Sequence, residues 1–115
     1  MKRISLFIFL VAALLFYTKA YAHAPSKIDL TFDRQTSILK AVIWHDVDNP
    51  QTHFIKRVDI GLKGRKLVTQ EFLEQDNQNT ETDIYSITEA KPGDYISVEA
   101  FCSIAGSLKE ELEVK

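Results

Sequence analysis

Four side chains of this chain can bind a transition metal through nitrogen or sulfur. They are its three histidines, His23, His45 and His53, and its single cysteine, Cys102. Imidazole and thiolate ligands together suit iron, zinc or copper, whereas calcium and magnesium prefer oxygen ligands. A single cysteine cannot form a disulfide within its own chain, so Cys102 is a buried thiol, an intermolecular partner or a metal ligand. Each histidine taken alone fits an ordinary surface position, so a site requires that the fold bring these residues together.

The N-terminal segment is typical of a secretory signal peptide. Lys2 and Arg3 are positive, residues 6–17 are almost all apolar, and Ala20-Tyr21-Ala22 has small residues where a signal peptidase cleaves. The apolar run is shorter than the roughly 20 residues that span a bilayer core. We therefore expect residues 1–22 to be a cleaved signal peptide, with an uncleaved membrane anchor as the alternative, and the mature protein to be periplasmic or secreted.

Cleavage would leave residues 23–115, which are enough for one domain with one modest core. It would remove the three positive charges of Lys2, Arg3 and Lys19 and change the formal net charge from −2 to −5. A chain with this charge is not expected to bind nucleic acid or an anionic membrane surface. The sequence does not indicate an oligomeric state.

The expected domain consists of short segments in which apolar and polar residues alternate, as in half-buried strands. Turn signals separate them, such as Lys91-Pro92-Gly93-Asp94, and only the last segment, with Lys109-Glu110-Glu111, could also form a helix. We therefore predict an all-β fold, an immunoglobulin-like antiparallel β-sandwich of about seven strands. The candidate strands are residues 27–32, 37–44, 53–62, 66–72, 82–87, 95–102 and 108–114.

This topology would place all four candidate ligands at one end of the sandwich. If consecutive strands run antiparallel, the second strand ends and the third begins at the end where the sixth also finishes. His45 and His53 flank the loop between the second and third strands, Cys102 closes the sixth, and His23 precedes the first. We therefore expect the donor atoms of His45, His53 and Cys102 to lie within several ångströms of one another.

Two segments of the chain resemble motifs of the desulfoferrodoxin and neelaredoxin superoxide reductases. Residues 45–55, HDVDNPQTHFI, resemble the family segment His-Pro, a short loop and His-Tyr-Ile, and residues 98–106, VEAFCSIAG, resemble its Cys-Asn-x-His-Gly signature. Members of that family hold a ferrous iron on an immunoglobulin-like domain through four equatorial histidines and an axial cysteine, and they reduce superoxide to peroxide by one electron. The resemblance implies that His45 and His53 are equatorial ligands and that Cys102 is the axial ligand.

The chain also departs from the family pattern. Ala105 stands where the signature has its last histidine, and the loop between His45 and His53 is longer than usual. The family histidine before the first strand has a counterpart in His23, but Ala22 stands where the family has a lysine. If cleavage follows Ala22, the free amine of His23 could chelate together with its imidazole, as in copper-binding histidine braces.

The sequence therefore favours an exported, non-haem iron-binding redox protein that resembles superoxide reductase, with superoxide and an electron-donor protein as partners. The absence of a ligand at Ala105 predicts weakened or lost activity, so whether the chain is an enzyme stays open. A metal-free immunoglobulin-like interaction module and a copper-binding protein that uses His23 are the alternatives. The sequence contains no Gly-rich phosphate loop and no CxxC motif, which argues against nucleotide-binding and thioredoxin-like functions.

Overall fold

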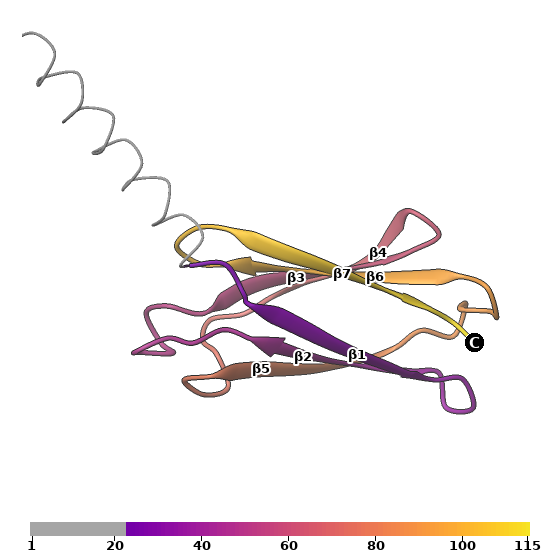
Figure 1. Ribbon diagram of the computed structural model, residues 1–115, viewed down its shortest axis with the longest axis horizontal. Helices are drawn as coiled ribbons and strands as arrows, with labels where there is room; N and C mark the ends of the chain where they lie inside the picture. Colours follow the sequence, from indigo (N-terminus) through magenta and orange to yellow (C-terminus); the bar gives the residue numbers. More distant parts are fainter. Residues whose placement is uncertain (1–22) are drawn as a thin grey trace, which may run out of the picture.

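The computed structural model describes residues 23–115, so the predicted signal peptide lies outside the described residues. These residues form two antiparallel sheets without a helix, and the prediction of an all-β sandwich of about seven strands is confirmed (Figure 1). Within the same range, no helix is long and apolar enough to cross a membrane. The strands are β1 (Lys27–Asp33), β2 (Ile38–Trp44), β3 (Ile55–Leu62), β4 (Arg65–Glu71), β5 (Thr80–Ser86), β6 (Tyr95–Cys102) and β7 (Ser107–Glu113).

One sheet has the strand order β1-β2-β5, and the other has the order β4-β3-β6-β7. β1 and β7 contact each other along one side of the sandwich. The fourth strand, β4, pairs with β3, whereas the fourth strand of a constant-type immunoglobulin domain belongs to the sheet of the first, second and fifth strands. Figure 1 shows β4 and its turn projecting away from the sheet of β1, β2 and β5.

The core lies between the two sheets and is built by alternate residues of their central strands. Successive strand residues point to opposite faces, so every second position is available to the core. The buried apolar side chains of β2, β3 and β6 in this core are Leu39, Ala41, Ile43, Ile55, Val58, Ile60, Leu62, Ile96, Val98 and Ala100.

The inward face of β5 carries acidic groups. Glu81, Asp83 and Tyr85 are 2%, 8% and 9% exposed, whereas Ile84 is 63% exposed on the outer face. Burial raises the pKa of Glu81 to about 8, because a charge is poorly solvated there, and the nearby charge of Asp83 acts in the same direction. The backbone N–H of Asp76 donates a hydrogen bond to Glu81 Oε2 at 2.8 Å and opposes this rise. The interior next to β5 therefore contains ionisable groups beside apolar ones.

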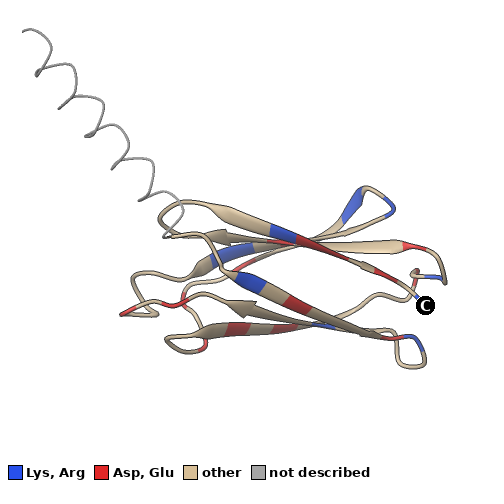
Figure 2. Cartoon of the chain, viewed as in Figure 1, with Lys and Arg blue, Asp and Glu red and all other residues tan. Residues whose placement is uncertain are grey.

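Local turn chemistry sets the ends of several strands. β3 and β4 are joined by the two residues Lys63 and Gly64, both with positive φ (54° and 75°), as in the two-residue hairpin turns that match strand twist. The basic residues of this hairpin stand out in Figure 2, whereas β5 carries acidic ones. The alternative of a helix at the end of the chain is wrong, because Ser107–Glu113 forms β7 and pairs with β6.

Candidate metal centre

The loops at one end of the sandwich bring His45, His53 and Cys102 together. His45 follows the last residue of β2, one residue separates His53 from the start of β3, and Cys102 is the last residue of β6. One ligand atom from each of these residues lies within 4.8 Å of the others. The three side chains thus converge as the sequence led us to expect, and the binding of a metal by them stays a prediction.

The position of His53 differs from the expectation, since it lies in a loop and not in the third strand. The backbone N–H groups of Thr52 and His53 both donate to the carbonyl oxygen of Asn49, at 3.1 and 2.9 Å, and form a turn. β3 begins only at Ile55. This turn directs the imidazole of His53 toward Cys102.

Cys102 is 2% exposed, and its Sγ lies 3.1 Å from Nε2 of His53. The backbone N–H of Ile104 donates to the same sulfur at 3.4 Å. The segments that carry the two residues are also joined directly. Phe54 N–H donates to Ser103 Oγ at 3.1 Å, and Ser103 N–H donates to the Phe54 carbonyl oxygen at 2.8 Å. These contacts fix the sulfur and the imidazole relative to each other.

His45 is 2% exposed and contacts other residues through both ring nitrogens. Its Nδ1 lies 2.9 Å from Gln75 Oε1, and its Nε2 lies 2.7 Å from the carbonyl oxygen of His23. Its ring meets that of His53 edge to face, with the centroids 4.9 Å apart. The side chain of His45 is therefore oriented from two sides.

Gln75 is a site residue that the sequence reasoning missed. It is 3% exposed, although it belongs to a polar stretch between β4 and β5 that is rich in Asn and Gln. Its side chain contacts His45, the backbone N–H of Ile55 and the carbonyl oxygen of Asn77. Nothing in the sequence distinguishes it from the exposed amides around it, because its burial results from loop packing.

His23 lies beside the cluster and is not one of its three convergent residues. Its ring centroid is 5.2 Å from that of His53, and its Nδ1 is buried without a hydrogen-bond partner. Gly106, with a φ of 86°, packs against this segment, since a Cβ at Gly106 would lie 2.9 Å from Cβ of Ala24. His23 therefore lies beside the cluster, and its role as a ligand stays a prediction. Ala105, in the turn between β6 and β7, adds no ligand.

The electrostatic surroundings of His53 favour its neutral form. Burial lowers the pKa of His53, and positive charge on His45 and His23 lowers it further, while Asp48 acts in the opposite direction. A histidine binds metal as the neutral imidazole.

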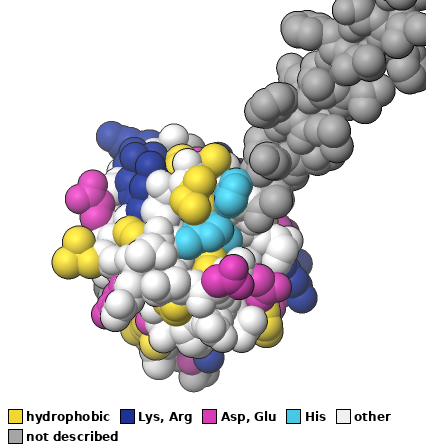
Figure 3. All heavy atoms as spheres, turned by 90° about the vertical axis from the view of Figure 1, so that its left-hand side faces the viewer, with side chains coloured by type: hydrophobic (Ala, Val, Ile, Leu, Met, Phe, Trp, Pro, Cys, Tyr) yellow, Lys and Arg dark blue, Asp and Glu magenta, His cyan; other side chains and the backbone are white. Residues whose placement is uncertain are grey.

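A hollow of about 450 Å³ opens beside the cluster and is lined in part by His23, His53, Asp46 and Asp48. Figure 3 shows the histidine side chains on this face, with acidic side chains next to them. Small molecules can therefore reach His53 from outside, and they pass carboxylates as they do so.

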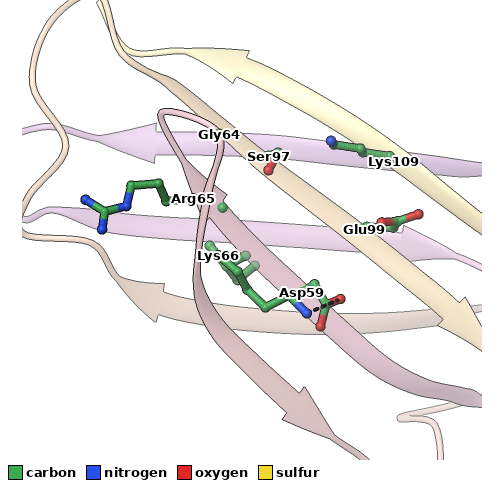
Figure 4. A pocket seen from close by; sticks show the side chains of 9 residues that line it. Asp59, Gly64, Arg65, Lys66, Ser97, Glu99 and Lys109 are labelled. Atoms are coloured by element: carbon green, nitrogen blue, oxygen red, sulfur yellow. Dashed lines mark ion pairs between the residues drawn. The ribbon is translucent and has the colours of Figure 1, made fainter.

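A second hollow, of about 180 Å³, lies on the outer face of the four-stranded sheet (Figure 4). Its lining mixes charges of both signs, and Lys66 Nζ lies 3.4 Å from Asp59 Oδ2. Gly61 lines this hollow without a side chain, and a Cβ there would lie 2.5 Å from Ser97 Oγ. Its lining contains neither histidine nor cysteine, so the cluster at the end of the sandwich is the better candidate for metal chemistry.

Comparisons with known proteins bear on the fold. No protein-family model matches the chain, and no curated protein sequence matches it. The solved structure of superoxide reductase (1Fe-SOR) from Giardia intestinalis is similar, with a TM-score of 0.54 and 13% sequence identity over 80% of this chain and 97% of that chain. At this identity the likeness shows the fold alone. The chain therefore has a superoxide-reductase-like β-sandwich fold, and a His/His/Cys cluster lies at one end of it.

Proposed function

We propose that this chain is an exported, non-haem iron-binding redox protein that reduces superoxide. The observation that carries the proposal is the convergence of His45, His53 and Cys102 to within 4.8 Å at one end of the sandwich. Two imidazoles and one thiolate are a donor set that suits iron, zinc or copper. The resemblance of residues 45–55 and 98–106 to superoxide reductase motifs, together with the similar fold, favours iron among these metals.

His23 is the candidate for a fourth ligand. Its ring lies next to that of His53, and its buried Nδ1 is without a hydrogen-bond partner. A buried imidazole nitrogen without a partner is costly, and coordination of a metal ion would remove that cost. The proposed site consists of three histidines and one cysteine.

Ferrous iron at this site would supply one electron to superoxide, which with two protons becomes hydrogen peroxide; an electron-donor protein would return the electron. The residues of the chain prepare the site for this reaction. Cys102 is buried, and its sulfur accepts a hydrogen bond from the backbone N–H of Ile104, which would orient it as a ligand. The hollow beside His53 gives a small substrate access to the cluster.

The experiment is to purify the chain without chelators, measure its metal content, and titrate the metal-free protein with Fe²⁺ and Co²⁺. We expect one metal ion per chain, a thiolate–Co²⁺ absorption band, and consumption of superoxide by the iron form. The variants Cys102→Ser and His53→Ala should lose the metal. Ile104→Ala is the matched control, because it changes a 55% exposed neighbour of Cys102 and keeps the backbone N–H that faces the sulfur.

If wild type retains no metal, or if Cys102→Ser binds as tightly as wild type, the proposal is wrong. A metal-free interaction module would then be the better interpretation of the same fold.

Copper binding is a second candidate function, and the position of His23 is the observation that favours it. If the mature chain began at His23, its amine and imidazole would lie beside His53 and could bind copper together. A chain that begins at His23 should then bind Cu²⁺ more tightly than one with an added alanine before His23. Equal Cu²⁺ affinities of the two chains would exclude the amine as a ligand.

A further inference from the structure

The hydrogen bonds of the buried amide Gln75 define its orientation. Its Nε2 lies 2.8 Å from the carbonyl oxygen of His45 and 2.9 Å from that of Asn77, and it donates one hydrogen to each. Its Oε1 accepts the backbone N–H of Ile55 at 3.2 Å. Reversing the amide would place its oxygen against two carbonyl oxygens and its NH₂ against an N–H. The acceptor end of Gln75 therefore faces Ile55 and His45.

Both ring nitrogens of His45 face oxygens that only accept hydrogen bonds. Nδ1 lies 2.9 Å from Gln75 Oε1, and Nε2 lies 2.7 Å from the carbonyl oxygen of His23. In the metal-free chain, a neutral ring can therefore donate to only one of the two oxygens. A metal ion at Nε2 would replace the contact with His23, and the ring proton would then lie on Nδ1 and be donated to Gln75.

We infer that Gln75 is a positioning residue, which holds the ring of His45 and accepts its Nδ1 proton when Nε2 binds the metal. The inference rests on the proposed function in one respect, namely that a metal ion binds at the cluster. Metal-bound histidines usually donate their other ring N–H to an oxygen acceptor, which orients the ring and makes the ligating nitrogen more basic. In this chain, a loop amide from between β4 and β5 takes that role.

The same side chain also ties together the loops that carry the ligands. Gln75 bonds to both the ring and the backbone of His45, and it bonds to Ile55, two residues after His53. The backbone N–H of Gln75 donates to the carbonyl oxygen of Pro50 at 3.0 Å, and Pro50 lies in the loop between His45 and His53. Replacing Gln75 is therefore expected to affect the relative placement of both imidazoles.

The test compares Gln75→Leu and Gln75→Glu with wild type, and Gln70→Leu on the exposed strand β4 serves as a matched control. The protonation of the ring nitrogens is read from ¹⁵N NMR shifts of the metal-free protein at mildly alkaline pH, and Co²⁺ affinity is measured by chelator competition. Wild type and Gln70→Leu should share the same distribution of the His45 proton between its two ring nitrogens. Gln75→Leu leaves the His23 carbonyl oxygen as the remaining acceptor, so it should move the proton toward Nε2 and lose about 10–100-fold in Co²⁺ affinity. Gln75→Glu keeps an acceptor at Nδ1, so Nδ1 should be at least as protonated as in wild type, and most of the affinity should remain.

An Nδ1 that is less protonated in Gln75→Glu than in wild type would overturn the inference. So would unchanged shifts and Co²⁺ affinity in Gln75→Leu. If Gln75→Leu does not fold, the comparison of wild type with Gln75→Glu still tests the inference. If wild type binds no Co²⁺ or Fe²⁺, the proposed function fails, while the NMR shifts still decide whether Gln75 fixes His45.

Discussion

Replacing Gly106 by alanine should displace the segment that carries His23. Gly106 has a φ of 86°, and an added Cβ would lie 2.9 Å from Cβ, 3.2 Å from Cα and 3.3 Å from N of Ala24. The shortest of these contacts is about 0.6–1 Å inside the 3.5–4.0 Å optimum for carbon atoms. Two of the three contacted atoms belong to the backbone, so relief requires that the chain around Ala24 move.

Gly93 provides the matched control, because its φ is 91° and an added Cβ there would meet nothing within 4 Å. Alanine at either position costs on the order of 1–3 kcal/mol for a non-glycine residue in the left-handed region. Only Gly106→Ala adds the steric overlap, for which overpacking costs of about 1–3 kcal/mol are typical. We therefore expect Gly106→Ala to reduce the free energy of unfolding by about 1–3 kcal/mol more than Gly93→Ala.

Urea denaturation of the two variants measures this difference. NMR of the His45 ring reports whether the contact between Nε2 and the His23 carbonyl oxygen, 2.7 Å in the structure, survives. The reasoning is refuted if the two variants are equally destabilised and the ring signals of His45 do not change in Gly106→Ala. That result would mean that residues near Ala24 adapt without cost and do not fix His23.

Three further predictions concern the ligand set, the substrate and the buried acid. Ala105→His should raise Fe²⁺ affinity and superoxide consumption several-fold by adding a ligand; a metal titration that shows no gain would place this turn too far from the cluster. Asp48→Asn should accelerate superoxide consumption at low ionic strength, because it removes a negative charge from the hollow beside His53, and the gain should shrink as salt is added. Glu81 has a pKa raised from 4.5 to about 8, so the folded state binds its proton more tightly than the unfolded state does, and stability from this group is lost as pH rises between those values. Glu81→Gln should therefore flatten the decline of the free energy of unfolding between pH 4.5 and 8 in urea titrations, and an equally steep decline in the variant would contradict this.

Much of the fold could be predicted from the alternation of apolar and polar residues. Segments such as Tyr95–Cys102 show one buried face in the sequence and keep it in the structure. Antiparallel connectivity then placed His45, His53 and Cys102 at one end, because the ends of β2 and β6 and the start of β3 meet there.

The remainder could not be predicted, since it depends on packing between distant segments. In β5, hydrophobicity alone would turn Ile84 inward, but the register with β2 turns Glu81 and Asp83 inward and leaves Ile84 63% exposed. Gln75 became part of the candidate site only through the path of its loop.

The inward carboxylates of β5 have a consequence for association between molecules. β5 and β4 are the outer strands on the side of the sandwich opposite the contact of β1 with β7, and an outer strand can pair with a strand of another chain. Inward-pointing charged residues and charged outer strands are among the features by which proteins discourage such pairing. Asp83 provides the first feature on β5, and Arg65, Lys66 and Glu71 provide the second on β4, where every residue is exposed. The inward acidic residue on β5 and the charged outer strand β4 are therefore expected to disfavour edge-to-edge pairing between molecules.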